Sequence, residues 1–362
     1  MKRHPAAEGP AIGRICELED ALAAEFRKHE PGQPLDSRLM SAARRWSQAV
    51  WQAAEERRPA SLNAEDLRDG LALAQRPVFI CGVQRSGTTL LRDLLDGHPQ
   101  LVVIPTEAAF YAGLEPALFG SPPQCHRAYL GCRWLERLAL PPPRWLLGRS
   151  SAASSPYVAF AGDLAAWMMV SEHRHEAKTP SWPLCALALA YAQHPGSRRI
   201  PPEAQRWVEK TPTSERFLAR IWHEFPAARV IHVVRRPQSA LASYAALNRH
   251  AWGPRGAAGH CLRNMAPSYR IARRAASRFS PERYLLIRYE DLVADRARVM
   301  ARVAGFLDIE ALPMLHQPTV AGRPASNNSS FAEPGSPRNL NRFERTLLRL
   351  TVTRNARSLG YR

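Results

Sequence analysis

The sequence contains very little lysine: only four of its 50 basic residues are lysine, and the rest are arginine. Acidic residues number 32, so the formal net charge is +18. Two interpretations of this excess are open, a coding bias toward arginine and a surface that attracts anions such as a nucleotide, an acidic substrate or a membrane face. The sequence has no motif of a nucleic-acid reader, so we expect no nucleic-acid partner.

Paired cysteines are missing as well. None of the six cysteines belongs to a CxxC pair, and none has a histidine at zinc-finger spacing. His173 and His175 are neighbours in the sequence, but no third candidate ligand lies nearby. This pattern indicates neither a zinc site nor a redox pair, and we expect no metal.

Long apolar runs are also absent. Those that exist, such as residues 184–192, are far too short to cross a bilayer, so we expect no transmembrane segment. The first residues, MKRHPAAEGPAIG, contain no apolar stretch of the kind that a secretory signal needs. We therefore expect a cytoplasmic protein.

Short β-prone runs alternate with helical patterns in most of the chain. The runs occupy residues 78–83, 229–234 and 284–288, and a helical pattern follows each of them. Apolar strands that alternate with helices predict an α/β fold, in which helices cover both faces of a central parallel sheet.

The pattern divides the chain of 362 residues into two parts. Residues 1–76 show helical spacing of apolar residues and are predicted to form a helical extension. Residues 77–362 are predicted to form the α/β domain. Within it, residues 112–206 are rich in proline, tryptophan and arginine and are interpreted as an insertion of helices and loops. Such an insertion either shapes a substrate site or is structural filler.

A glycine-containing loop follows the first predicted strand. The sequence GVQRSGTT, residues 82–89, fits the pattern G-x-x-x-x-G-x-T between a strand and a helix. Backbone N–H groups in such a loop and the positive end of the helix dipole together bind an anion. The candidate ligands of that anion are Arg85, Ser86, Gly87, Thr88 and Thr89.

One position of this loop bears on the kind of phosphate chemistry. A nucleoside triphosphatase carries lysine directly before the Ser/Thr of the motif, whereas this chain has Thr88 there. The nearest cation is Arg85, and no Walker-B carboxylate is visible. A kinase or ATPase is therefore disfavoured.

The segment VFICGVQRSGTTLLRDLLDGHPQL resembles the 5′-phosphosulfate-binding segment of the sulfotransferases. It is most similar to the bacterial branch related to protein-tyrosine sulfotransferases, in which His-Pro follows the loop as His98 and Pro99 do here. The resemblance runs from about residue 77 to residue 362. It implies a P-loop-type three-layer fold and an enzyme that moves the sulfuryl group of 3′-phosphoadenosine-5′-phosphosulfate (PAPS) to a hydroxyl-type acceptor without a metal.

The segment RVIHVVRRPQSALASY matches a second motif of this family. Arg235 follows a predicted strand and Ser243 lies about two helical turns further on, so the two side chains can converge on one anion. The resemblance implies that this anion is the 3′-phosphate of PAPS, which an arginine fork suits. The family usually has Asp or Asn where this chain has Arg236.

Besides Arg85 of the loop, two further residues are implied by the resemblance to act on the reacting groups. Lys210 stands in a K-T-P tripeptide where the family places a lysine beside the transferring sulfuryl group. Lys178 also precedes Thr-Pro, but only Lys210 has the downstream sequence of the family. Glu107 stands where the tyrosine sulfotransferases carry their catalytic glutamate and is the predicted general base. The alternative is a helix-capping or substrate-binding acid.

Two C-terminal segments also resemble the family. IRYEDLVADRARVMARVAGFLDI implies that Tyr289 stacks on or lines the adenine, and the polar loop RPASNNSSF implies that Ser329 contacts the donor nucleotide. The acceptor is left open among a peptide tyrosine, a carbohydrate, a lipid and a small phenol. The alternative functions are a P-loop kinase and a nucleotide-binding protein of the same fold that has lost catalysis.

Overall fold

The computed structural model describes residues 9–28, 36–56, 62–114, 123–139, 154–193, 202–320, 323–324 and 340–361. The chain divides into two compact units. Met1–Ala74 and Gly113–Pro202 form the first, which we call the helical unit, and Gln75–Ala112 and Glu203–Arg362 form the second, the sheet unit. The predicted extension and most of the predicted insertion, which are separate in the sequence, thus belong to one unit.

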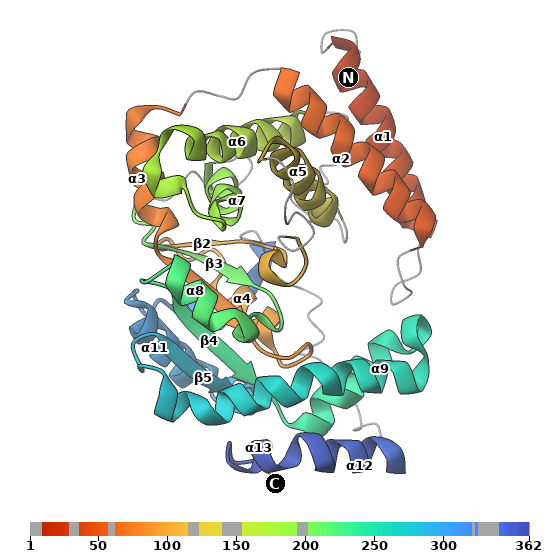
Figure 1. The fold of residues 1–362 in the computed structure, drawn as a ribbon, viewed down its shortest axis with the longest axis vertical. Coiled ribbons are helices and arrows are strands. Elements are labelled where there is room, and N and C mark those ends of the chain that lie inside the picture. The colour runs from red at the N-terminus through yellow and green to blue at the C-terminus, as the bar shows by residue number, and fades with distance from the viewer. Residues whose placement is uncertain are drawn as a thin grey trace. The chain divides into compact units, whose positions relative to one another are not determined.

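The described part of the helical unit is built from helices (Figure 1). These are α1 (Gly9–Lys28), α2 (Ser37–Glu56), α3 (Ala64–Ala74), α5 (Pro123–Ala139), α6 (Ser154–His173), the 3-10 turn η5 (His175–Ala177) and α7 (Trp182–Gln193). Helix α2 packs on α1, α5 and α6, and its Trp46 meets Tyr157 of α6 edge-on with ring centroids 4.7 Å apart. Helix α7 is apolar on all sides because it is buried along its length.

Five parallel strands form the centre of the sheet unit, in the order β2-β3-β1-β4-β5. They are β1 (Pro77–Cys81), β2 (Leu101–Val103), β3 (Arg206–Lys210), β4 (Arg229–Val234) and β5 (Tyr284–Arg288). Strand β1 lies between β3 and β4, with Ile80 paired to both Lys210 and Ile231. Strand β1 reads as a continuous apolar run because helices cover both faces of the sheet, whereas the inner strand β3 also carries Arg206, Glu209 and Lys210.

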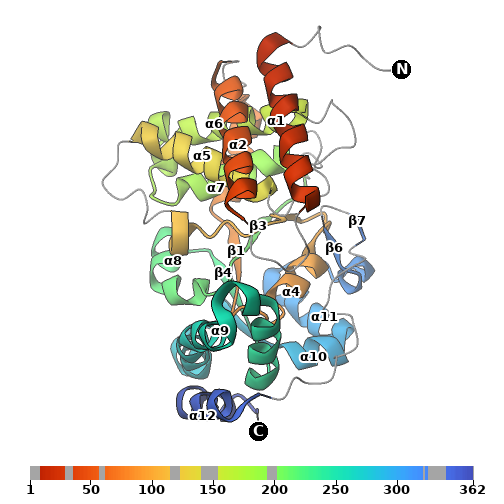
Figure 2. The same cartoon turned by 90° about the vertical axis from the view of Figure 1, so that its right-hand side faces the viewer.

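One face of the sheet packs against α4 (Thr88–Leu95) and α11 (Arg296–Leu307), through a core that includes Ile80, Leu91 and Val303. The other face carries an aromatic cluster, in which Phe79 lies 5.9 Å from Trp207 and 6.2 Å from Phe225, and is covered by α8 (Leu218–Glu224) and α9 (Pro237–Arg278) (Figures 1 and 2). This three-layer arrangement confirms the predicted α/β fold.

Shorter elements complete the sheet unit. They are η2 (Phe110–Leu114), which runs across the unit boundary, η6 (Ser214–Phe217), α10 (Tyr289–Ala294), η7 (Pro313–His316), the antiparallel pair β6 (Thr319–Val320) and β7 (Arg323–Pro324), α12 (Arg342–Thr351) and α13 (Thr353–Arg357). Helices α12 and α13 pack on α9. Helix α9 contains a break at Gly253, whose φ of 65° and ψ of 168° are not helical.

The predicted strands 229–234 and 284–288 coincide with β4 and β5, and the predicted strand 78–83 overlaps β1. Strand β2 was not predicted, because three residues are too few to show a periodicity. Among the described residues, no helix is long and apolar enough to cross a membrane.

Candidate active site

The loop between β1 and α4 has an unusual backbone conformation, with three positive φ values. Gly82, Arg85 and Gly87 have positive φ values of 139°, 68° and 101°. At Gly87 a side chain is also excluded by space, since a Cβ atom there would lie 2.3 Å from Cδ2 of Tyr289. Helix α4 begins directly after this glycine, so the positive end of its dipole faces the loop. The geometry is that of an anion-binding loop.

Ser86 provides an independent indication of a ligand. Its hydroxyl group is buried and has no hydrogen-bond partner among the residues that the structure describes. Buried hydroxyl groups in native proteins are normally paired. A phosphate or sulfate oxygen held in the loop would supply the missing partner.

Two arginines join the loop to distant parts of the chain. The Nε of Arg85 donates to Oγ of Ser243 on α9 at 3.0 Å, and Nη1 of Arg235, after β4, donates to the carbonyl oxygen of Arg85 at 3.1 Å. Burial, and then the charge of the neighbouring Arg235, lower the pKa of Arg85. A bound anion would relieve the repulsion between the two guanidinium groups. Arg235 and Ser243 both contact Arg85, which thereby joins the two residues that were predicted to share one anion.

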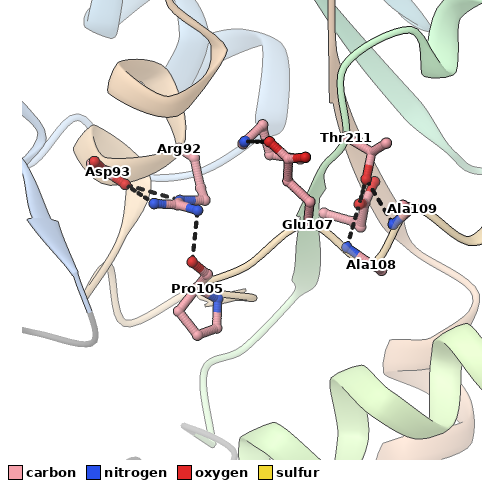
Figure 3. A network of polar contacts seen from close by, with 9 residues as sticks. Arg92, Asp93, Pro105, Glu107, Ala108, Ala109 and Thr211 are labelled. Carbon is pink, nitrogen blue, oxygen red and sulfur yellow. Dashed lines mark hydrogen bonds and ion pairs between the residues drawn. The ribbon is translucent and has the colours of Figure 1, made fainter. Parts of the chain in front are cut away.

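The side chains of Lys210 and Glu107 form an ion pair at the end of β3, in which Nζ of Lys210 donates to Oε1 of Glu107 (Figure 3). The lysine side chain is 3% exposed, whereas that of Glu107 is 41% exposed. Burial lowers the pKa of Lys210, and the charge of Glu107 opposes that shift. The pair therefore presents a partly exposed carboxylate beside a buried cation.

These groups surround one cavity of about 500 Å³ in the sheet unit. The predicted residues that line it are Arg85, Gly87, Thr88, Thr89, Glu107, Lys210 and Arg235. Ser243 reaches the site through its bond to Arg85. Tyr289 is 9% exposed and packs on Gly87. The guanidinium carbon of Arg235 lies over the Tyr289 ring, 4.3 Å from the ring centroid. Ser329 lies outside the described residues.

Sequence reasoning missed the segment that follows Lys210. Thr213 donates its backbone N–H to the carbonyl oxygen of Gly82 at 2.9 Å, and the buried Glu215 accepts from the N–H of Gly82 at 3.0 Å. Both backbone groups of the first loop residue are thereby fixed. The signal that could have revealed this is the polar run TPTSE directly after a buried strand.

Other lining residues were also not predicted: Gln84, Ala109, Ala112, Thr211, Pro212, Thr213, Tyr244, Leu247 and Asn248. Those on α9 and near η2 lie far from the loop in sequence, and of them only Tyr244 falls within a quoted motif, as the last residue of RVIHVVRRPQSALASY. They add uncharged groups to the lining of the cavity.

Fold and site together give an α/β protein with a glycine-containing loop of anion-binding geometry at the carboxyl edge of a parallel sheet. The model of one family, the sulfotransferase family, matches residues 77–313, which is more than half of the chain. The chain therefore belongs to the sulfotransferase family. Membership supports a transferase activity that needs a sulfuryl donor and an acceptor.

Solved structures with a similar fold include three bacterial sulfotransferases or sulfotransferase domains. The domain from a Synechococcus olefin synthase is 20% identical, with a TM-score of 0.43, and the match covers 79% of this chain and 96% of that one. The domain from the curacin biosynthetic pathway is 20% identical, with a TM-score of 0.44 and coverages of 79% and 98%. A sulfotransferase from Mycobacterium tuberculosis is 16% identical, with a TM-score of 0.41 and coverages of 85% and 86%. No curated protein matches the chain.

Proposed function

We propose that this chain transfers the sulfuryl group of PAPS to a hydroxyl-type acceptor in the cavity of the sheet unit. The observation that carries the proposal is that the anion-binding loop, the two arginines and the Lys210–Glu107 pair all line one cavity. A site that only bound an anion would need the first two features but not the third.

The donor would be held by the loop and the arginines. The backbone of residues 82–87, with the hydroxyl groups of Ser86, Thr88 and Thr89, would hold the 5′-phosphosulfate. Arg235 and Ser243 would hold the 3′-phosphate, for which a guanidinium group is a suitable partner. Tyr289, under Arg235, fixes the plane of that guanidinium and would lie near the adenine.

The transfer itself would use Lys210 and Glu107. The acceptor oxygen forms a bond to sulfur as the bond from sulfur to the 5′-phosphate oxygen breaks, and Glu107 takes the proton of the acceptor hydroxyl. An ammonium group has three N–H donors, so Lys210 can bond Glu107 and a sulfuryl oxygen at once. Its charge would stabilise the negative charge that develops on the leaving oxygen.

This function is tested by an assay for transfer of the ³⁵S label from PAPS, with EDTA present to remove metal ions. The acceptors are a phenol, a sugar, a fatty alcohol and a tyrosine peptide, and water is the reference. We expect Lys210→Ala to reduce turnover about 10²–10³-fold, the usual cost of one electrostatic donor. The matched control is Lys178→Ala, since the exposed Lys178 also precedes Thr-Pro. Its turnover should equal that of the wild type.

Three results would count against this function. Equal turnover of Lys210→Ala and Lys178→Ala would show that Lys210 takes no part in the reaction. Phosphoryl transfer from Mg·ATP would favour the kinase. Binding of PAPS without turnover on any acceptor or water would favour the non-catalytic alternative.

A further inference from the structure

The segment that carries Glu107 is bonded at several residues to the end of strand β3. The N–H of Ile104 donates to the carbonyl oxygen of Val208 at 3.0 Å, which extends the pairing of β2 and β3 by one bond. Beyond that point the segment leaves the sheet. Side chains of β3 and of the residue after it then bond the segment in place of backbone groups. The Lys210–Glu107 ion pair is one of these contacts.

Glu209 and Thr211, on either side of Lys210, hold the next two residues. Oε1 of Glu209 accepts from the N–H of Ala108 at 3.2 Å, and Oγ1 of Thr211 accepts from the N–H of Ala109 at 3.0 Å (Figure 3). The Thr211 hydroxyl in turn donates to Oε1 of Glu209. The two side chains thus form one network that fixes both amides directly after Glu107.

Arg92 on α4 fixes the other side of Glu107. Its Nη1 donates to the carbonyl oxygen of Pro105 at 2.6 Å, while its Nε and Nη2 bond Oδ1 of Asp93 at 2.9 and 2.6 Å (Figure 3). Arg92 and Asp93 are both buried, which leaves this bond little freedom. The backbone is therefore held two residues before Glu107 and one and two residues after it.

The backbone at Ala109 carries strain that this network must offset. Its φ of 49° lies in the left-handed region, which is sterically unfavourable for a non-glycine residue. Such conformations persist where surrounding contacts determine them and are concentrated at functional sites. Here the determining contact is the hydrogen bond to Thr211.

Burial of the Glu209 carboxyl group in the core is energetically unfavourable. Glu209 is 2% exposed and lies in the sheet opposite Phe79. Burial raises the pKa of Glu209 to about 7, an effect that its bonds to Thr211 and Ala108 reduce. A carboxyl group in this position costs stability that an apolar residue would not. A contribution to the site would explain its presence.

We propose that Glu209, through Thr211 and the amides of Ala108 and Ala109, is a positioning residue that holds the carboxylate of Glu107 in register with Lys210. The inference rests on the proposed function. Glu209 does not line the cavity, so it acts on the reaction through the segment and not by contact with substrate. Displacement of a catalytic group by about 1 Å can cost 10²-fold in rate.

The test compares Glu209→Leu with Glu209→Gln. Leucine removes the acceptor, whereas the glutamine carbonyl can accept the same two hydrogen bonds. We expect Glu209→Leu to lower kcat for ³⁵S transfer from PAPS about 10–100-fold, with KM for PAPS and binding of 3′,5′-adenosine bisphosphate (PAP) changed less than threefold. Glu209→Gln should restore kcat to within about threefold of the wild type.

Two variants of Thr211 keep the test valid if leucine at position 209 prevents folding: Thr211→Val has the same shape but lacks the hydroxyl group, whereas Thr211→Ser keeps it. Amide hydrogen exchange, which requires no substrate, should be about tenfold faster at Ala109 in Thr211→Val than in the wild type and normal in Thr211→Ser. Because the residues form one network, the double variant of Glu209→Leu and Thr211→Val should be no slower in transfer than its slower parent.

Normal kcat in both Glu209→Leu and Thr211→Val, or equal loss in Glu209→Gln and Glu209→Leu, would overturn the inference. Normal exchange at Ala109 in Thr211→Val would also overturn it. If instead the wild type transfers no sulfuryl group, the proposed function fails and the inference fails with it. The two failures are therefore distinguished by the wild-type rate.

Discussion

The roles that we propose for single residues of this site follow from differences in their solvation. Lys210 and Glu107 are ion-pair partners, yet the lysine is buried and the glutamate is partly exposed. A buried ammonium is poorly solvated and interacts strongly with any negative charge that develops nearby. An exposed carboxylate can meet an acceptor hydroxyl. In the proposed reaction, the buried Lys210 is therefore suited to the electrostatic role and the partly exposed Glu107 to proton transfer.

The pH dependence of the reaction should report the solvation of Lys210. Burial lowers its pKa, while Glu107 opposes the shift and Arg92 adds to it. A step that needs the ammonium form proceeds fully below this pKa and is lost as the pH rises through it. We expect the alkaline limb of kcat/KM for PAPS to lie below about 10.4, the value of an ordinary lysine.

Lys210→Arg is the control for that limb, because a guanidinium group stays protonated above pH 12. In this variant the limb should move upward, whatever the absolute rate. An alkaline limb at the same pH in both proteins would show that another group titrates there.

Among the elements, the loop between β1 and α4 depends most on one residue type. We expect Gly87→Ala to lower the free energy of unfolding by about 1–2 kcal/mol, from its positive φ alone, and to weaken PAP binding as the loop moves away from Tyr289. Urea unfolding and calorimetry measure the two effects.

Gly305→Ala on α11 is the matched control for that substitution, since no atom lies within 4 Å of its Cβ position. This variant should be unchanged or more stable by up to about 1 kcal/mol, because alanine favours a helix. Equal stability and equal PAP binding in both glycine variants would contradict the account of the loop.

The sequence predicts the elements around the loop well and the contacts between them poorly. Strands β4 and β5 are visible as short apolar runs because most of their residues are buried, and helix α4 is visible from the helical pattern that follows the loop. The network of Glu209, Thr211 and Arg92 is not visible, because it joins side chains to backbone amides about 100 residues away or to an irregular segment. The predicted roles of the site residues, Glu107, Lys210, Tyr289 and Ser329 among them, stay predictions.

At the scale of the whole molecule, the arginine excess has more than one use. Arg206 is 3% exposed and donates to the carbonyl oxygen of Leu307, and Arg229 bonds the carbonyl oxygen of Phe306. Part of the +18 charge is therefore structural, and part lies at the site as Arg85 and Arg235. Composition alone could not separate these uses, because it contains no information on position.

The division into two units could likewise not be predicted from the sequence pattern. Periodicity shows that α2 has an apolar face, but not that this face meets α5 and α6 from a segment some 75–120 residues later. Partner choice depends on the shapes of both surfaces, and a single sequence shows only one apolar face at a time.

The central claim, that this is a site for PAPS, is tested most directly by calorimetric titration with PAP and, separately, with Mg·ADP. We expect PAP to bind to the wild type and to Arg236→Ala, the variant of the neighbouring exposed arginine. In Arg235→Ala, binding should weaken about 10–100-fold, the equivalent of one charge-assisted hydrogen bond. Binding of Mg·ADP without any response to PAP would contradict the account.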